Sequence, residues 1–210
     1  MPLQASDLEF RYTDNADQSS NTLSLGGTIS SNTIPTSSPN VFDDVTADES
    51  EAGDTEYRAI GLINTSATFD FLDVKVWITG YNRAASGADT IYFALENPGG
   101  SPSSIQTISD ESTAPDTSKF TVATGDTVSW TEEGSPSSTL TFGTISAGGS
   151  NWMGIWLKRV VPAGATAYSN RSCTIKVRGE TTGSPLQVVE KELVVRVDEG
   201  AFRVYEVSPI

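Results

Sequence analysis

The sequence predicts an all-β protein, an antiparallel β-sandwich with an extended N-terminal arm and loops and a C-terminal strand pair. Apolar and polar residues alternate with a period of two over many short segments, which is typical of half-buried strands. Ser and Thr together make up 52 of the 210 residues, and 18 Gly and 10 Pro are spread among them. These residues favour turns and strands over helices. Many short strands without long helices indicate two sheets packed face to face.

The expected strands follow one another along the chain and are separated by turn signals such as Asn97-Pro98-Gly99-Gly100 and Ala147-Gly148-Gly149. Their expected ranges are 8–12, 57–63, 71–78, 90–95, 120–122, 127–130, 140–145, 152–160, 173–177, 186–197 and 202–207.

Two neighbouring strands are expected to form a hairpin. The segments 57–63 and 71–78 are separated by a turn at Asn64-Thr65-Ser66. In the second of them the alternation places four apolar side chains on one face, namely Leu72, Val74, Val76 and Ile78.

The chain is expected to have three parts: an extended arm with the first strand (1–55), a β-sandwich body (56–180) and a C-terminal β-hairpin (186–210). Residues 13–55 show little alternation and are expected to lie across the sandwich. Two interpretations of the last part stay open. It completes the sandwich, or it projects and pairs with a neighbouring subunit, because an isolated hairpin is unstable in water.

The charge and composition of the chain exclude several classes of partner and of chemistry. Thirteen basic and 27 acidic residues give a net charge of −14 and a pI near 4.2. Such a chain is repelled by nucleic acid and by anionic membranes, so neither is expected as a partner. There is no histidine, which removes the commonest general base and metal ligand. We therefore expect no enzyme activity, no catalytic residues, no cofactor and no metal, and a small-molecule ligand is not expected.

An acidic stretch offers oxygen ligands at a density that suits calcium. Its spacing does not match an EF-hand loop, so a solvated loop is the preferred interpretation. A paired-carboxylate glycosidase remains the least favoured alternative. The carboxylates are Asp43, Asp44, Asp48, Glu49, Glu51 and Asp54.

The aromatic residues allow a second kind of site, because aromatic rings stack on sugar faces. Trp152 and Trp156 lie two pleats apart on one face of a strand, which favours a role in the core instead. Cys173 alternates with Ile175 and Val177 and is expected to point inward. The remaining candidates for a sugar platform are Trp77, Trp130, Tyr57, Tyr81, Tyr92 and Tyr168.

Two further patterns concern processing of the chain. Asn64-Thr65-Ser66 and Asn170-Arg171-Ser172 match the glycosylation pattern. The first residues contain no basic segment followed by an apolar one, so no signal peptide is expected and the two matches are attributed to chance.

Four runs of residues resemble a group of proteins encoded in tailed bacteriophages and prophages. The runs are FDDVT (42–46), GDTEYR (53–58), VKVWI (74–78) and WLKRVVPAGA (156–165), and the resemblance spans residues 7–180. It implies a virion structural component without catalytic activity. Ala59 stands where that group would have a cysteine.

The function expected from these features is that of a virion structural protein, made in the host cytoplasm without export and then assembled into the particle. The preferred role is a capsid decoration or cement protein, an oligomer that binds the major capsid protein or other virion proteins and bridges capsomers. The alternatives are a tail, baseplate or fibre component, and a carbohydrate-binding or adhesion module.

Overall fold

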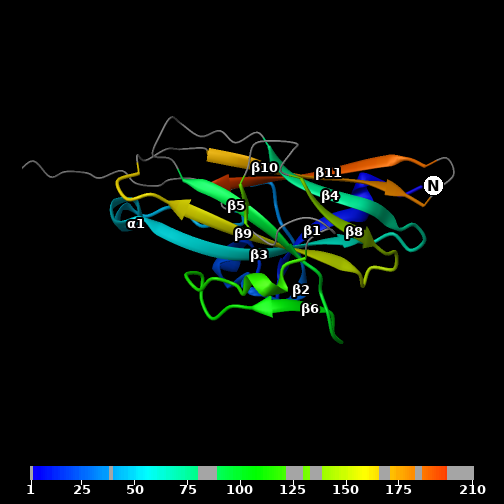
Figure 1. Cartoon of the computed structure of the whole chain (residues 1–210), viewed down its shortest axis with the longest axis horizontal. Helices are drawn as coiled ribbons and strands as arrows, with labels where there is room; N and C mark the ends of the chain where they lie inside the picture. The colour runs from blue at the N-terminus through cyan, green and yellow to red at the C-terminus, as the bar shows by residue number, and fades with distance from the viewer. Residues whose placement is uncertain are drawn as a thin grey trace, which may run out of the picture.

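The computed structural model describes residues 2–37, 40–79, 89–121, 130–132, 139–165, 171–182 and 186–197. Strands take up 52% of the structure and helices 11%. Two antiparallel sheets pack together, as Figure 1 shows, and this confirms the all-β sandwich expected from the sequence. No helix in the described part of the chain is long and apolar enough to cross a membrane.

The larger sheet has seven strands in the order β6-β2-β1-β3-β9-β5-β7. Its longest contact joins β3 and β9, which pair over ten residues from Asp54↔Val161 to Ile63↔Trp152. The strands are β1 (Leu8–Thr13), β2 (Gly26–Thr33), β3 (Asp54–Asn64), β5 (Thr90–Glu96), β6 (Ser104–Thr107), β7 (Thr131–Glu132) and β9 (Trp152–Val161).

The smaller sheet has four strands in the order β11-β10-β4-β8, and it leaves β11 at one edge. β10 and β11 pair over ten residues, from Arg171↔Val197 to Glu180↔Val188. The strands are β4 (Phe71–Thr79), β8 (Leu140–Ile145), β10 (Arg171–Thr181) and β11 (Val188–Val197).

Four short helices complete the described chain. The helix α1 (Ala47–Ala52) begins with a capping box in which the Thr46 hydroxyl accepts from the Glu49 amide and the Glu49 carboxylate accepts from the Thr46 amide. The others are 3₁₀ turns: η1 (Ala5–Asp7), η2 (Gln18–Leu23) and η3 (Thr117–Lys119).

The expected hairpin between 57–63 and 71–78 is wrong, because β3 and β4 lie in different sheets. The chain crosses from one sheet to the other through residues 65–70. The Asn64 side chain is buried and donates to the carbonyls of Phe69 and Ile145, which fixes this crossing. Period-two patterns identify strands but do not identify their partners.

A β-bulge changes the expected inner face of β4. Asp73 has a φ of 49°, and the pairing of β4 with both neighbours shifts register around it. Phe71 is consequently buried in place of Leu72, while Val74, Val76 and Ile78 face inward as expected. Gly179 lies opposite the bulge, where a Cβ would stand 2.6 Å from the Leu72 carbonyl oxygen.

The sandwich extends beyond residues 56–180 at both ends. β1 and β2 belong to the seven-stranded sheet, and β11 belongs to the four-stranded sheet. Val189, Leu193 and Val195 of β11 are buried in the core, which corresponds to the interpretation that the last part completes the sandwich. β2, β6 and α1 were not expected, since their sequences lack a clear apolar period. The expected strand at 202–207 lies outside the described residues.

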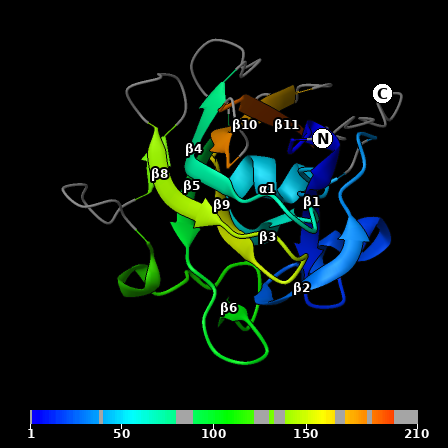
Figure 2. The same ribbon diagram turned by 90° about the vertical axis from the view of Figure 1, so that its right-hand side faces the viewer.

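Two separate hydrophobic clusters hold the molecule together. One lies between the sheets and includes Met153, Ile155 and Leu157 of β9. The other lies on the outer face of the seven-stranded sheet and includes Trp152 and Trp156, the alternate residues of the same strand. Figure 2 shows β6, the edge strand of this sheet, on the opposite side of β3 and β9 from β10 and β11. The two tryptophans are therefore buried as expected, but beneath β6 and its loops and not between the sheets.

Candidate functional site

The edge of β11 has two halves that differ in what covers them. At its C-terminal end the edge is closed by one side chain, Asn40, which is fully buried. Its Nδ2 donates to the Val194 carbonyl at 2.7 Å, and its Oδ1 accepts from the Arg196 amide at 3.0 Å. The amide of Asn40 thus takes the place that the backbone of a neighbouring strand would occupy.

Several contacts hold Asn40 in this position. Its Oδ1 also accepts from the Val41 amide, and its carbonyl accepts from the Tyr12 hydroxyl at 2.5 Å. The adjacent Arg196 side chain donates to the Thr36 carbonyl at 2.8 Å. Asn40 is therefore tied to both β1 and β11, and we call it the Asn40 plug of this edge.

The N-terminal half of the same edge has no such cover. Val194 and Arg196 direct backbone groups away from β10, and in a paired strand every second residue does so. Val188, Glu190 and Glu192 therefore point their amides and carbonyls outward, and all three residues are exposed. Within the described ranges, none of these outward groups makes a hydrogen bond. The helix η1 lies nearby, and its Ala5 carbonyl accepts from Lys191 Nζ at 3.1 Å.

A groove of about 240 Å³ lies between residues 191–194 of β11 and the seven-stranded sheet. Its apolar wall comes from β1, the end of β2 and β11, through Phe10, Ile34, Leu193 and Val194. Glu9 and Glu192 stand at its rim. A strand added to β11 would direct every second side chain towards this wall.

The outer face of the four-stranded sheet carries little of the negative charge of the protein. Of the described side chains that point outward from β4, β10 and β11, four are basic and four are acidic, whereas the whole chain has a net charge of −14. Ion pairs cross this face, including Lys176–Glu192 at 2.5 Å and Lys75–Asp73 at 2.9 Å. Exposed pairs of this kind add little stability, so they bear mainly on what the face can approach.

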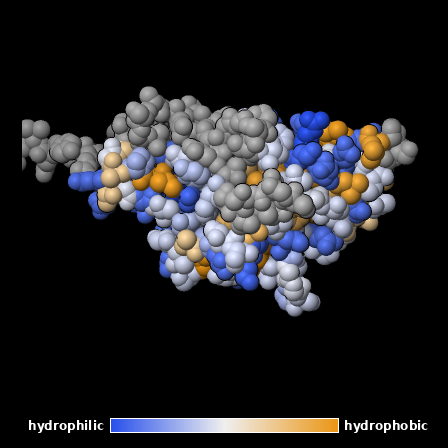
Figure 3. Space-filling view, viewed as in Figure 1, coloured by the Kyte–Doolittle hydropathy of each residue, from blue (hydrophilic) through white to orange (hydrophobic). Residues whose placement is uncertain are grey.

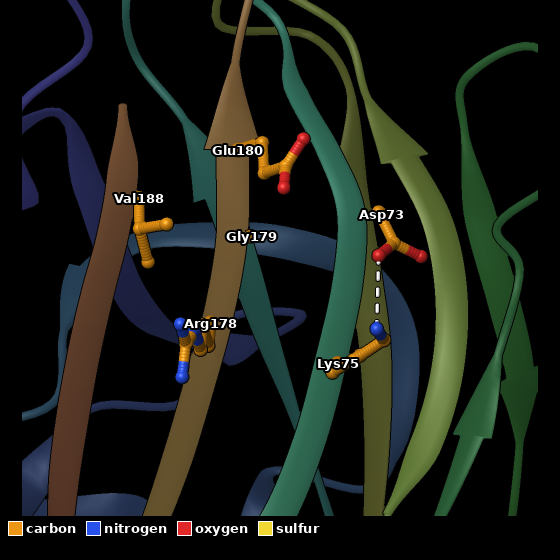
Figure 4. Close-up of a pocket in the computed structure, with 6 residues that line it drawn as sticks. All are labelled: Asp73, Lys75, Arg178, Gly179, Glu180 and Val188. Carbon is orange, nitrogen blue, oxygen red and sulfur yellow. Dashed lines mark ion pairs between the residues drawn. The ribbon is translucent and has the colours of Figure 1, made fainter. Parts of the chain in front are cut away.

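A shallow hollow of about 200 Å³ lies on this face beside the bulge. Figure 4 shows its lining, in which Lys75 and Arg178 stand beside Asp73 and Glu180. Val188 closes the hollow at β11 and is 52% exposed, and Leu186 just before the strand is 64% exposed. Figure 3 shows hydrophobic and hydrophilic side chains intermixed at the end of the molecule where β11 begins.

A buried ionic cluster lies between the sheets at the end nearest α1. Glu56 and Arg159 are direct partners in the β3–β9 pairing and both face inward. Arg159 Nε donates to Glu56 Oε2 at 2.6 Å, and Arg159 Nη1 donates to the Asp43 carbonyl at 2.8 Å. Arg58 contacts three carboxylates, those of Glu111 at 2.6 Å, Asp43 at 3.0 Å and Glu56 at 3.4 Å.

Burial has a large effect on the pKa of Glu56 in this cluster. Desolvation raises the pKa of Glu56 to about 7, while the charges of Arg159 and Arg58 act in the opposite direction. The two guanidinium groups also lie over the Phe42 ring, at 4.9 and 5.7 Å from its centroid. The cluster binds the segment around Asp43 and the loop at Glu111 to β3 and β9, and its role is therefore structural.

The acidic stretch 43–54 is divided among structural roles. Asp43 binds Arg58, Glu49 caps α1, and Asp54 begins β3. The oxygens of Asp43, Glu56 and Glu111 lie within 4.8 Å of one another, and Glu49, Asp54 and Glu56 form a similar group. In the first group the positive charge is supplied by the Arg58 guanidinium. Neither group gives an argument for calcium.

The described aromatic residues of the alternative sugar platform lie in two places, the outer cluster of the seven-stranded sheet and the outer face of β4. Trp152 and Trp156 are buried, and Trp77 lies on the outer face of β4. Tyr57 and Trp130 lie together with ring centroids 5.6 Å apart. The Lys158 ammonium lies 4.2 Å from the Tyr92 ring and 5.2 Å from the Trp130 ring. Tyr81 and Tyr168 lie outside the described residues.

Two other sequence features have clear positions. Asn64 is fully buried and its amide is engaged, so the pattern Asn64-Thr65-Ser66 offers no accessible acceptor for a glycan. Cys173 is buried in the core between the sheets, which confirms that it points inward. Asn170 lies outside the described residues.

Sequence reasoning did not identify Asn40, Glu56 or Arg159 as important residues. The alternation within 54–64 does place Glu56 and Arg58 on the same face as Ile60 and Leu62, which is the signal of a buried charged pair. No comparable signal points to Asn40, because its partners on β11 lie more than 150 residues away in the chain.

Comparisons with known proteins give structural likenesses and no sequence relative. No protein-family model matches this chain, and no curated protein matches it. A solved structure titled "Structure of the N-terminal domain of PorA" aligns with 92% of this chain and 99% of its own length. The sequence identity is 13% and the TM-score is 0.39.

Proposed function

We propose that this protein is a non-enzymatic virion structural protein that decorates the outside of a capsid as an oligomer. The observation that carries the proposal is the open half of the β11 edge, at Val188, Glu190 and Glu192, which is continuous at Glu192 with an apolar groove. Unpaired backbone groups on an edge strand can be completed by a strand from another chain. Such an edge suits a protein that works by joining other chains.

The mechanism is mechanical. A decoration protein stabilises a capsid by burying surface against two or more capsomers, so that separating them requires this surface to be exposed again. A rigid sandwich with two hydrophobic clusters supplies the body, and the β11 edge supplies a directional contact. The net charge of −14 keeps free copies soluble at high copy number.

The test is direct. Purified particles of the phage that encodes this chain are analysed by quantitative mass spectrometry and cryo-electron microscopy. We expect a copy number comparable to that of the major capsid protein and density on the outer capsid surface. Particles assembled without the gene are expected to rupture at lower temperature or in lower salt. Density confined to the tail or baseplate would support the tail alternative and contradict a decoration role.

The aromatic group formed by Tyr57, Tyr92, Trp130 and Lys158 supports a second candidate function, carbohydrate binding. A glycan array followed by titration monitored by tryptophan fluorescence tests it. We expect Trp130→Ala to abolish binding if the group forms the site, and Trp77→Ala, on the other sheet, to leave it unchanged.

A further inference from the structure

We propose that the open half of the β11 edge receives residues 202–207 of a second copy of this chain, which add a strand to the four-stranded sheet. The inference deepens the proposed function and rests on it in one respect, since it names a contact through which copies join. It depends otherwise only on the edge, the Asn40 plug, the groove and the charges described above.

The Asn40 plug argues against pairing of this segment with its own β11 through a tight turn. A turn at Asp198-Glu199-Gly200 would place residues 202–204 opposite Arg196 and Val194. The outward groups at those two positions are already bound to Asn40. To pair with Glu192 of its own chain, the segment would have to leave the sheet and run back past β11 from Val197 to Glu192. This distance is about 17 Å, at about 3.3 Å per residue.

The open half of the edge matches the segment in length and pattern. Residues 202–207, FRVYEV, are rich in aromatic and β-branched residues, which favour strands. Six residues are enough to pair with the edge from Val188 to Glu192. Because side chains alternate in a strand, those of one set that lie near Glu192 would face the apolar wall formed by Phe10, Ile34 and Leu193.

The charges favour this occupant over a second β11. Residues 202–207 contain one basic and one acidic residue, Arg203 and Glu206, so they add no excess of negative charge beside Glu190 and Glu192. Pairing two β11 edges with each other would bring Glu190 and Glu192 of both copies together on one face. Like charges placed opposite each other in a sheet are destabilising.

The experiment compares two substitutions at one edge position in the full chain. Glu190→Pro removes an amide that points outward and leaves the hydrogen bonds to β10 in place, because proline is tolerated on the free side of an edge strand. Glu190→Ala is the matched control, since it removes the same charge and keeps the amide. Light scattering coupled to size exclusion gives the mass of each variant across a concentration series.

We expect the wild-type chain and Glu190→Ala to have masses above the 22.3 kDa of one copy, and Glu190→Pro to have the mass of one copy. Val204→Pro is expected to have the same effect from the side of the segment, with Val204→Ala as its control. A wild-type chain of 22.3 kDa at all concentrations would overturn the proposal, and so would a Glu190→Pro variant that associates like Glu190→Ala.

A peptide experiment covers the case in which a proline variant does not fold. A synthetic peptide of residues 198–210 is added in excess to the wild-type oligomer, and a scrambled peptide serves as the control. We expect only the native peptide to lower the mass of the oligomer. Two further peptides carry N-methyl groups at residues 202, 204 and 206 or at residues 203, 205 and 207. We expect one of these two peptides to have no effect, because its methyl groups replace the amide hydrogens that would bond to β11. A native peptide without effect would overturn the proposal. These measurements use purified protein, so they separate failure of this contact from failure to bind a capsid.

Discussion

The substitution Arg159→Met tests whether the buried ionic cluster holds the end of the sandwich together. It removes the Nε bond to Glu56, the bond from Nη1 to the Asp43 carbonyl, and the contact with the Phe42 ring. Methionine keeps an unbranched apolar stem, so the loss of the charge is the main change. Removing one partner of a buried ion pair typically costs about 3–5 kcal/mol, because the other charge stays buried without compensation.

The free energy of unfolding that Arg159→Met removes is expected to be larger at high pH than at low pH. In the wild-type protein burial raises the pKa of Glu56 from 4.5 to about 7. Between these values the folded chain holds a proton that the unfolded chain has released. The stabilisation from this proton is fully present below about pH 4.5 and is lost as the pH rises to about 7. Removing the Arg159 charge raises the pKa of Glu56 further, so the loss becomes larger and continues to higher pH.

Urea unfolding at pH 5 and pH 8 measures both effects. We expect Arg159→Met to lower the free energy of unfolding by about 3–5 kcal/mol at pH 8, and by at least about 1.4 kcal/mol less at pH 5, where Glu56 carries a proton. Arg178→Met, on the exposed face of β10, is the control and is expected to change stability by less than about 0.5 kcal/mol. A cost at pH 8 below about 1 kcal/mol, or one that does not change with pH, would refute the reasoning.

Three further predictions follow from burial and connectivity. Trp156→Ala is expected to cost about 3–5 kcal/mol in a thermal or urea melt, since the indole is fully buried and its Nε1 donates to Glu96 at 2.8 Å; a variant as stable as the wild type would contradict its role in the outer cluster. Deleting residues 186–210 is expected to unfold the domain, because β11 supplies core residues, whereas deleting residues 198–210 is expected to keep the circular dichroism spectrum of a β protein. Thermal melts with calcium and with a chelator are expected to coincide, and a shift of several degrees would show that the carboxylates around Asp43 bind metal.

The sequence by itself determined the fold class and most of the strands. Alternation over residues 140–145, 152–160 and 173–177 marked three strands, because a half-buried strand needs one apolar and one polar face wherever it lies. Burial of Trp152, Trp156 and Cys173 followed from the same pattern. These are local properties, and a local pattern is enough to predict them.

Other features were decided only by the tertiary structure. Nothing in residues 57–78 shows that β3 and β4 belong to different sheets, because pairing depends on distant strands that compete for the same edge. The bulge at Asp73 changed which of Phe71 and Leu72 is buried, since one extra residue in a strand reverses the faces beyond it.

The candidate site depends most strongly on long-range contacts. Asn40 closes part of an edge formed by residues 194–196, and the groove beside that edge combines residues from β1, β2 and β11. Strand edges come into existence only when the sheets are assembled, because the backbone groups left unpaired are those that no other strand in the chain has reached. The open half of β11 is therefore a property of the assembled sheet that the local pattern of residues 188–192 does not contain.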